Sequence, residues 1–283
     1  MTSDGRASPH PRQRRIVMRK KSTRRLLPIL LLVGAAPASG QVISPTQFCD
    51  HPLLPLRIDA MIGGSAWSYA ATGSEAASLE RETESVVPVA RDTALALLAT
   101  TVASESDGDA LAVPTAYLCS ADGIRPASAD QVSIPLPFGD LVIDIVLKSQ
   151  EGVLLPPFEE MVLGHSWQAD YVVEVTILRG EDEKARIELG VTMDAMVAGF
   201  ADVDVPAGQF IDTWVVDQRF AFSIQGRSRA ALRPGLVREL AVPLDRTLYL
   251  AEGVGLVHLD SQGPRQGGES LDLVDYFIPQ PTR

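Results

Sequence analysis

The chain has 283 residues and a formal net charge of −11, with 36 acidic side chains against 25 basic ones. A chain this acidic repels nucleic acid and anionic membrane surfaces, which excludes both as expected partners. Its hydrophobic content of 46% is enough to build a core and excludes global disorder.

The first forty residues have the layout of a secretory signal peptide. A basic stretch at 19–25 leads into an apolar run at 26–36, and small residues follow up to Gly40. The run of about 11 residues is too short to cross a bilayer as a helix. We therefore expect residues 1–40 to be a cleaved signal peptide, with Met18 as an alternative translation start and an uncleaved anchor as the alternative interpretation. The mature chain would have no transmembrane span and would be secreted, periplasmic or held in the cell envelope.

Cys49 and Cys119 are the only two cysteines of the chain. Export makes a disulfide between them permissible, because oxidising compartments preserve such bonds. The alternative is a pair of buried free thiols. There is no C-x-x-C motif, so cysteine-based redox chemistry and a zinc site are not expected.

Two-residue alternation is the clearest local pattern. Between 167 and 177 the odd positions are apolar and the even positions mostly polar, and 185–193 alternates in the same way. The polar turn 179–184 between these runs predicts a β-hairpin. Further strands are predicted at 65–72, 94–103, 115–120, 141–147, 211–216, 219–224, 247–250, 255–260 and 271–277.

Helical patterns are few. Residues 91–101 could form a helix or a β-hairpin, and 228–240 is broken by Pro234 and Gly235. Many short strands joined by glycine and proline turns predict a mainly β fold with few short helices. The expected architecture is a curved antiparallel sheet, either a partial barrel or a sandwich.

Comparison of the chain with itself indicates a duplication. Residues 53–69 and 154–171 both run Leu-Leu-Pro, an apolar pair, glycine, a small residue, tryptophan and tyrosine. Residues 117–124 and 249–256 also match, in the same order along the chain. The sequence therefore predicts a first β repeat at 41–150 and a second at 151–283, which could share one sheet.

Three motifs in the second repeat carry a resemblance to known proteins. They are Gly-x-Ser-Trp at 164–167, Val-Pro-Ala-Gly-x-Phe at 205–210 and Tyr-x-x-Glu-Gly-Val-Gly-Leu-Val at 249–257. This ordered set resembles exported bacterial proteins of unknown function and is similar to uncharacterised lipoprotein-like families of the half-barrel type. The resemblance covers 153–279 well and 52–128 weakly, and the first copy lacks the Val-Pro-Ala-Gly turn. It implies a fold and no catalytic residues.

No motif of a known active site is present. The chain has no G-x-S-x-G elbow, H-E-x-x-H, P-loop or dinucleotide fingerprint. His51, His165 and His258 have no identifiable partners in sequence and are expected to be structural. The acidic clusters at 80–84, 107–109, 181–183 and 202–204 are interpreted as solvated turns, because calcium needs several oxygens converging on one loop. We expect no catalytic residue, no metal and no cofactor.

Five aromatic residues could line a concave ligand face or fill the core: Trp67, Tyr69, Trp167, Tyr171 and Trp214. The leading hypothesis is an exported, non-enzymatic β domain that binds an apolar ligand, a lipid or an envelope protein within a curved sheet. One alternative is a structural or protein-interaction module with a filled core. A second is a hydrolase whose site is not visible in the sequence.

Overall fold

The computed structural model describes residues 44–72, 77–104, 110–127, 132–135, 141–180, 182–225, 243–262 and 269–280. The predicted signal peptide, the segment 228–240, most of the proline-rich stretch before β11 and the acidic pair at 107–109 lie outside these ranges. The described residues belong to one compact unit, Val42–Arg283. Most of them are in strands, and the two helices described are short 3-10 turns, η1 (Pro45–Cys49) and η2 (Phe158–Glu160). Neither helix has the length and hydropathy to cross a membrane.

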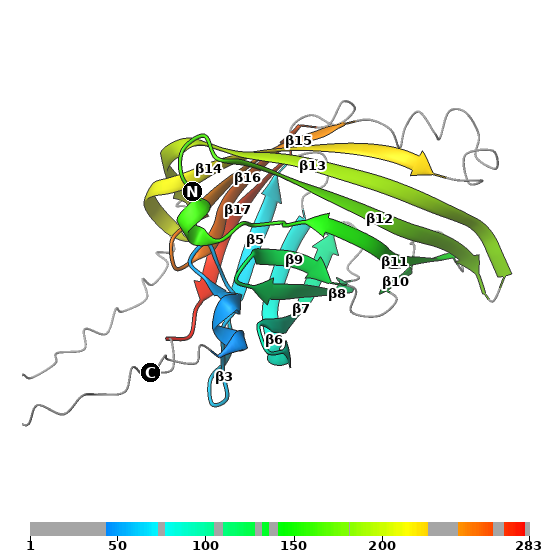
Figure 1. The fold of residues 1–283 in the computed structure, drawn as a ribbon, viewed down its shortest axis with the longest axis horizontal. Coiled ribbons are helices and arrows are strands. Elements are labelled where there is room, and N and C mark those ends of the chain that lie inside the picture. The colour runs from blue at the N-terminus through cyan, green and yellow to red at the C-terminus, as the bar shows by residue number, and fades with distance from the viewer. Residues whose placement is uncertain are drawn as a thin grey trace, which may run out of the picture. The chain divides into compact units, whose positions relative to one another are not determined.

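One antiparallel sheet of 13 strands dominates the fold, in the order β10-β11-β12-β13-β14-β15-β16-β17-β5-β6-β7-β8-β9. Figure 1 shows this sheet bending round on itself, so that β12 to β14 lie opposite β7 to β9. Its two edge strands, β9 and β10, follow each other in the chain. The strand bounds are β5 (Ala66–Thr72), β6 (Ala77–Ala90), β7 (Thr93–Ser104), β8 (Ala110–Ser120), β9 (Gly123–Ala127), β10 (Val132–Pro135), β11 (Leu141–Gly152), β12 (Ser166–Arg179), β13 (Asp182–Val205), β14 (Gly208–Gln225), β15 (Leu244–Ala251), β16 (Gly255–Gln262) and β17 (Glu269–Phe277).

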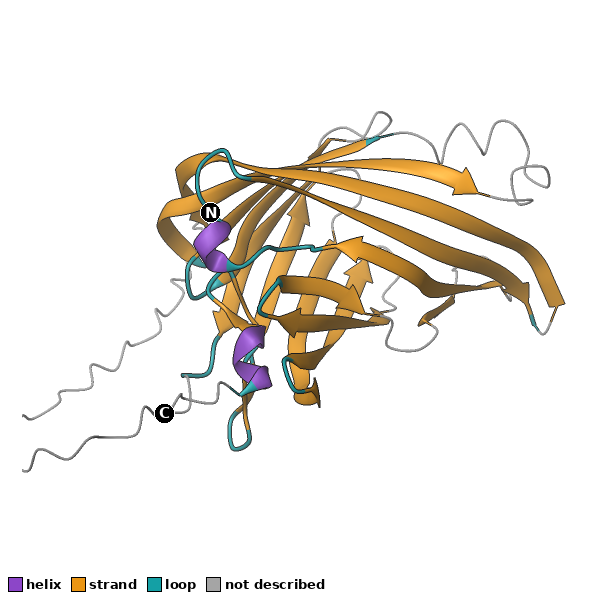
Figure 2. Ribbon diagram, in the orientation of Figure 1, coloured by secondary structure: helices purple, strands orange, loops and turns teal. Residues whose placement is uncertain are grey.

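Two small ladders precede the main sheet. They pair β1 (Asp50–His51) with β2 (Leu54–Pro55), and β3 (Ile58–Asp59) with β4 (Gly63–Gly64). Figure 2 shows how completely strands make up the fold, with both short helices near the same end of the sheet. The mainly β, curved and barrel-like architecture expected from the alternation is confirmed.

Side-chain alternation accounts for the two faces of the sheet. On β12, Ala169 and Tyr171 are buried while Gln168 and Asp170 between them are exposed. Successive side chains of a strand point to opposite faces of the sheet. The face that carries the apolar side chains is therefore the one turned toward the interior. The predicted strands are all present, with 211–216 and 219–224 joined into the single strand β14, and the ambiguous segment 91–101 lies mostly in strand β7.

The expectation that the acidic cluster at 80–84 is a turn was wrong. It lies within β6, where Glu80, Glu82 and Glu84 are exposed while Thr83 is buried. The three acids lie on the outward face of the strand, and its inward face carries Leu79 and Arg81. The acids at 202–204 likewise lie on β13, on the solvent side of a strand. Acidic residues at every second position are as compatible with an exposed strand face as with a loop.

Both predicted repeats contribute to the same sheet. Strands β5 to β9 run as a meander, and β12 to β17 run as a second one. β11, which crosses the predicted boundary between the repeats, pairs with β12, and β17, which ends the second repeat, pairs with β5. Each half therefore completes the other, and the topology is consistent with the predicted duplication, which itself stays a prediction.

The two Leu-Leu-Pro segments also dock reciprocally. We call 117–124 and 249–256, the matched segments that contain the turns 121–122 and 252–254, the closing turns of the first and second repeats. The Leu-Leu-Pro segment of the second repeat binds the closing turn of the first: Ile124 N–H donates to Leu155 O, and Leu154 N–H donates to Ile124 O, both at 2.8 Å. Pro52, the residue just before the segment of the first repeat, makes the corresponding contact with the turn 252–254 of the second repeat, where Gly253 N–H donates to Pro52 O at 2.7 Å. Each contact therefore joins a residue in or next to one Leu-Leu-Pro segment to the matched segment, 117–124 or 249–256, of the other repeat.

A disulfide ties the N-terminal segment to the sheet. It joins Cys49, at the end of η1, to Cys119 on β8, and both residues are fully buried. Of the two alternatives for the cysteines, the structure contains the bonded one. The crosslink holds η1 against β6, β7 and β8, which it contacts.

His51 links the two Leu-Leu-Pro segments. Its Nδ1 accepts a hydrogen bond from Leu53 N–H at 3.0 Å, which leaves the proton on Nε2, and Nε2–H donates to Pro156 O at 3.1 Å. Burial lowers the pKa of His51 below its usual 6.5, although the Pro156 carbonyl and nearby acids oppose this effect. The neutral imidazole is therefore the form that fits.

This arrangement predicts a pH-dependent stability. Because the folded-state pKa is lowered, the unfolded chain binds more protons just below pH 6.5, and the contribution of His51 is lost as the pH falls from there through the folded-state pKa. We expect the His51→Gln variant to lose less stability than the wild type between pH 7.5 and pH 5. Urea unfolding at a series of pH values measures this. Parallel pH profiles for the two proteins would contradict the assignment.

Candidate functional site

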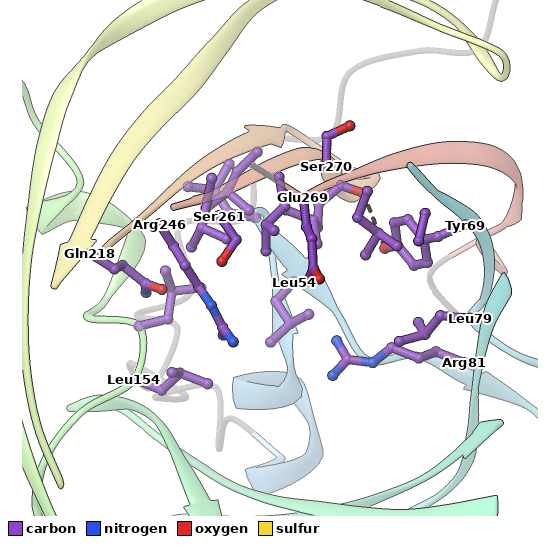
Figure 3. A pocket seen from close by; sticks show the side chains of 18 of the residues that line it. Leu54, Tyr69, Leu79, Arg81, Leu154, Gln218, Arg246, Ser261, Glu269 and Ser270 are labelled. Carbon is purple, nitrogen blue, oxygen red and sulfur yellow. Dashed lines mark hydrogen bonds between the residues drawn. The ribbon is translucent and has the colours of Figure 1, made fainter. Parts of the chain in front are cut away.

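A cavity of about 530 Å³ lies inside the curved sheet. Most of its lining is aliphatic, and Figure 3 shows these side chains converging from several strands. The lining residues are Leu53, Leu54, Tyr69, Ala71, Leu79, Arg81, Tyr117, Leu154, Leu155, Gln218, Phe220, Arg246, Leu248, Leu250, Leu256, Leu259, Ser261, Glu269, Ser270 and Leu271.

The two Leu-Leu-Pro segments form part of this lining together. Leu53 and Leu54 come from the first segment, and Leu154 and Leu155 from the second. The reciprocal docking of the segments brings these four leucines to one place, although they are about a hundred residues apart in the chain. The repeated sequence motif therefore marks one wall of the cavity.

The remaining lining comes from strands whose inner phase is apolar. On β15, Leu248 and Leu250 lie on the same face of the strand as Arg246. β17 contributes Leu271, which is paired with Ala71 of β5. Tyr69, also on β5, donates its hydroxyl to Leu256 O at 3.1 Å, and burial raises its pKa, so the phenol stays protonated.

Two arginines and one glutamate are the charged members of the lining. Arg81 and Arg246 are partly buried, whereas Glu269 is exposed. Burial lowers the pKa of Arg246, with Glu269 acting in the opposite direction, and its guanidinium stays charged at neutral pH. The Cζ of Arg246 lies 5.3 Å from the centre of the Phe220 ring, a cation–π distance.

Of the five aromatic residues predicted as a ligand face, Tyr69 lines this cavity and the other four are outside its lining. Each tryptophan donates its indole N–H to a main-chain carbonyl: Trp67 to Val254 O at 2.6 Å, Trp167 to Leu154 O at 3.2 Å and Trp214 to Met161 O at 2.9 Å. These bonds fix the loops at the end of the sheet. Burial raises the pKa of Tyr171 to about 12.

The histidines have partners that the sequence did not reveal. His258 Nδ1 lies 2.5 Å from Asp272 Oδ1, its cross-strand neighbour, and His258 Nε2 lies 3.2 Å from Asp260 Oδ1. His165 stacks on Trp167 with 5.9 Å between ring centres. Neither histidine lines the cavity. Among the described residues, no group of three or more His, Cys, Asp or Glu is arranged to hold a metal ion.

Sequence reasoning missed Arg81 and Arg246, although a signal was present. Each arginine lies on the inward face of its strand. Arg81 shares that face with Leu79 and Thr83, two positions before and after it, and Arg246 shares it with Leu248. An arginine on an inward phase differs from one on an exposed face, because the interior solvates its charge poorly.

No family model and no curated protein matches the chain. Two solved structures align with it. One, from Bacteroides fragilis, is a predicted exported protein with a YmcC-like fold; it is 12% identical, covers 78% of this chain and 99% of its own, and has a TM-score of 0.45. The other, a predicted lipoprotein from Parabacteroides distasonis, is 11% identical, covers 78% and 98%, and has a TM-score of 0.46. At these values no residue role is transferred.

Proposed function

We propose that this protein is an exported, non-enzymatic β domain that binds an apolar ligand inside its curved sheet. The observation that carries the proposal is the cavity of about 530 Å³, of whose lining residues half are leucines. Binding sites for small molecules typically occupy roughly 300–1,000 Å³ and combine apolar walls with a few polar groups. Both properties are present here.

The cavity favours ligand binding over the alternative of a structural module with a filled core. Protein interiors pack as densely as organic crystals, and empty spaces larger than a few water molecules are rare in them. The pocket is partly open to solvent, and the leucines that line it leave apolar surface that a bound hydrocarbon would cover.

Two observations support the export and non-enzyme parts of the proposal. The buried disulfide between Cys49 and Cys119 fits an oxidising compartment, as does the basic stretch and apolar run at the start of the sequence. His258, the histidine held between two carboxylates, lies outside the cavity lining, so it does not meet a ligand bound there.

Filling the cavity should abolish binding. Ala71 lines the cavity, and its neighbour Ala70 is on the opposite face of β5, in register with Asp272 on the side of His258. We expect Ala71→Trp to weaken binding of the uncharged apolar probe N-phenyl-1-naphthylamine about tenfold or more, because the indole occupies the ligand volume. Fluorescence titration of the purified chain measures the affinity.

Ala70→Trp is the matched control, since the same indole is added one residue away on the outer face. Its affinity for the probe should equal that of the wild type. If the wild type does not bind the probe, or if both variants bind it equally well, the proposed function fails.

A further inference from the structure

The cavity contains charges that an uncharged apolar ligand does not explain. Arg81 enters it from β6 and Arg246 from β15, two strands that are not neighbours in the sheet. In the view of Figure 3 the two guanidinium groups point from opposite sides toward the middle of the pocket, on either side of Leu54. The following inference rests on the proposed function and concerns the chemistry of its ligand.

Neither arginine has its hydrogen-bonding capacity satisfied within the described part of the chain. The Nε atoms of Arg81 and Arg246 are buried without a hydrogen-bond partner, and neither side chain is in an ion pair with a described residue. Arg186, in contrast, lies on the outside and pairs with two acids, Glu174 and Glu183. Burying a charged donor without a partner is costly, so such groups are usually paired.

The balance of charge inside the cavity is positive. Two guanidinium groups face one carboxylate, that of Glu269, which is exposed and therefore screened by solvent. This contrasts with a chain whose net charge is −11. A ligand with one negative charge would neutralise the lining and would supply acceptors for the unpartnered Nε–H groups.

The geometry of guanidinium selects the kind of anion. Its planar fork of donors matches the two oxygens of a carboxylate or phosphate, and it is more weakly hydrated than an ammonium group. The leucines around Arg81 and Arg246 would then contact a hydrocarbon portion of the same molecule. We infer that the cavity binds a single-chain amphiphile with an anionic carboxylate or phosphate head group, which Arg81 and Arg246 hold.

Four probes with the same twelve-carbon chain test this inference: dodecanoate, dodecyl phosphate, dodecan-1-ol and dodecyltrimethylammonium. Each is titrated into the wild-type chain carrying N-phenyl-1-naphthylamine, and displacement of the fluorescent probe gives the affinity. A charge-assisted hydrogen bond should make the anions compete at concentrations about tenfold or more below that of dodecan-1-ol. The cation should compete least. The better of the two anions identifies the head group as carboxylate or phosphate.

Arg81→Met and Arg246→Met remove the charge while keeping a side chain of similar length. Each should abolish most of the preference for the anions over dodecan-1-ol, measured as the ratio of the two affinities in the same variant. Arg186→Met, an exposed arginine on β13, is the control and should keep the wild-type preference.

The outcomes separate this inference from the proposed function. Wild-type chain that binds the fluorescent probe but prefers dodecan-1-ol, or shows no preference among the four, overturns the anionic ligand and leaves an apolar carrier. Wild-type chain that binds no probe overturns both. The wild-type comparison requires no variant, so it decides the question even where a methionine substitution prevents folding.

Discussion

Replacing both Cys49 and Cys119 with alanine is expected to lower the free energy of unfolding by about 4 kcal/mol. The disulfide closes a loop with a sequence separation of 70, and the loop-closure entropy that it removes from the unfolded chain accounts for a stabilisation of this size. Chemical denaturation of the oxidised wild type and of the double variant measures the difference. Since the total stability of a domain is about 5–15 kcal/mol, this is among the largest changes available.

The same bond also has a local role that gives a second readout. It fixes η1, the short helix that precedes His51 and the first Leu-Leu-Pro segment. Losing it should therefore weaken binding of N-phenyl-1-naphthylamine as well as stability. Wild type that has been unfolded and then refolded and measured in excess dithiothreitol is the control, and it should match the double variant. A double variant as stable as the oxidised wild type would show that the crosslink does not contribute.

Gly123→Ala is expected to be the most damaging single substitution at the reciprocal contacts. Gly123 has a φ of +117°, and a Cβ there would lie 2.4 Å from Leu155 O, a main-chain atom that cannot rotate away. Strain in the backbone and overpacking each cost roughly 1–3 kcal/mol, so we expect a loss of about 3 kcal/mol or more. The Leu-Leu-Pro segment of the second repeat would have to move off β9.

Gly253→Ala provides the matched control. Gly253 is also at positive φ, +75°, in the closing turn of the second repeat, but a Cβ there meets nothing within 4 Å. Its cost should be limited to the left-handed conformation, about 1–2 kcal/mol. Thermal unfolding of both variants measures the difference. Equal destabilisation would mean that the close approach of Leu155 to Gly123 does not matter.

Local pattern was sufficient for the strands and their faces. The alternation around Ala169 and Tyr171 predicted which side chains are buried, because the two-residue period of a strand is a property of the chain itself. The mainly β class and the barrel-like curvature followed from many such segments. The same reasoning misplaced Glu80, Glu82 and Glu84, because an acidic run with exposed positions has the composition of a turn whether or not a strand passes through it.

The candidate site was only partly predictable. Aromatic size drew attention to Trp67, Trp167 and Trp214, whose indoles are engaged with main-chain carbonyls. The residues that line the cavity are mostly leucines together with Arg81 and Arg246. Leucine is so common in cores that no single one indicates a ligand site. An arginine is expected to be exposed to solvent unless its position places it on the inward face of a strand.

The sequence by itself determined the strand faces, the matching segments 117–124 and 249–256 and the pair of Leu-Leu-Pro segments, since each depends on residues close together in the chain. The tertiary structure alone decided that β17 pairs with β5, that each Leu-Leu-Pro segment binds the other repeat's closing turn, and that Arg81 and Arg246 face one cavity. The strand pair β17–β5 and the two arginines join residues more than a hundred positions apart, and even the contact between Ile124 and Leu155 lies beyond any local sequence pattern. Their free energy depends on assembling the whole sheet, and no local period of the sequence reports it.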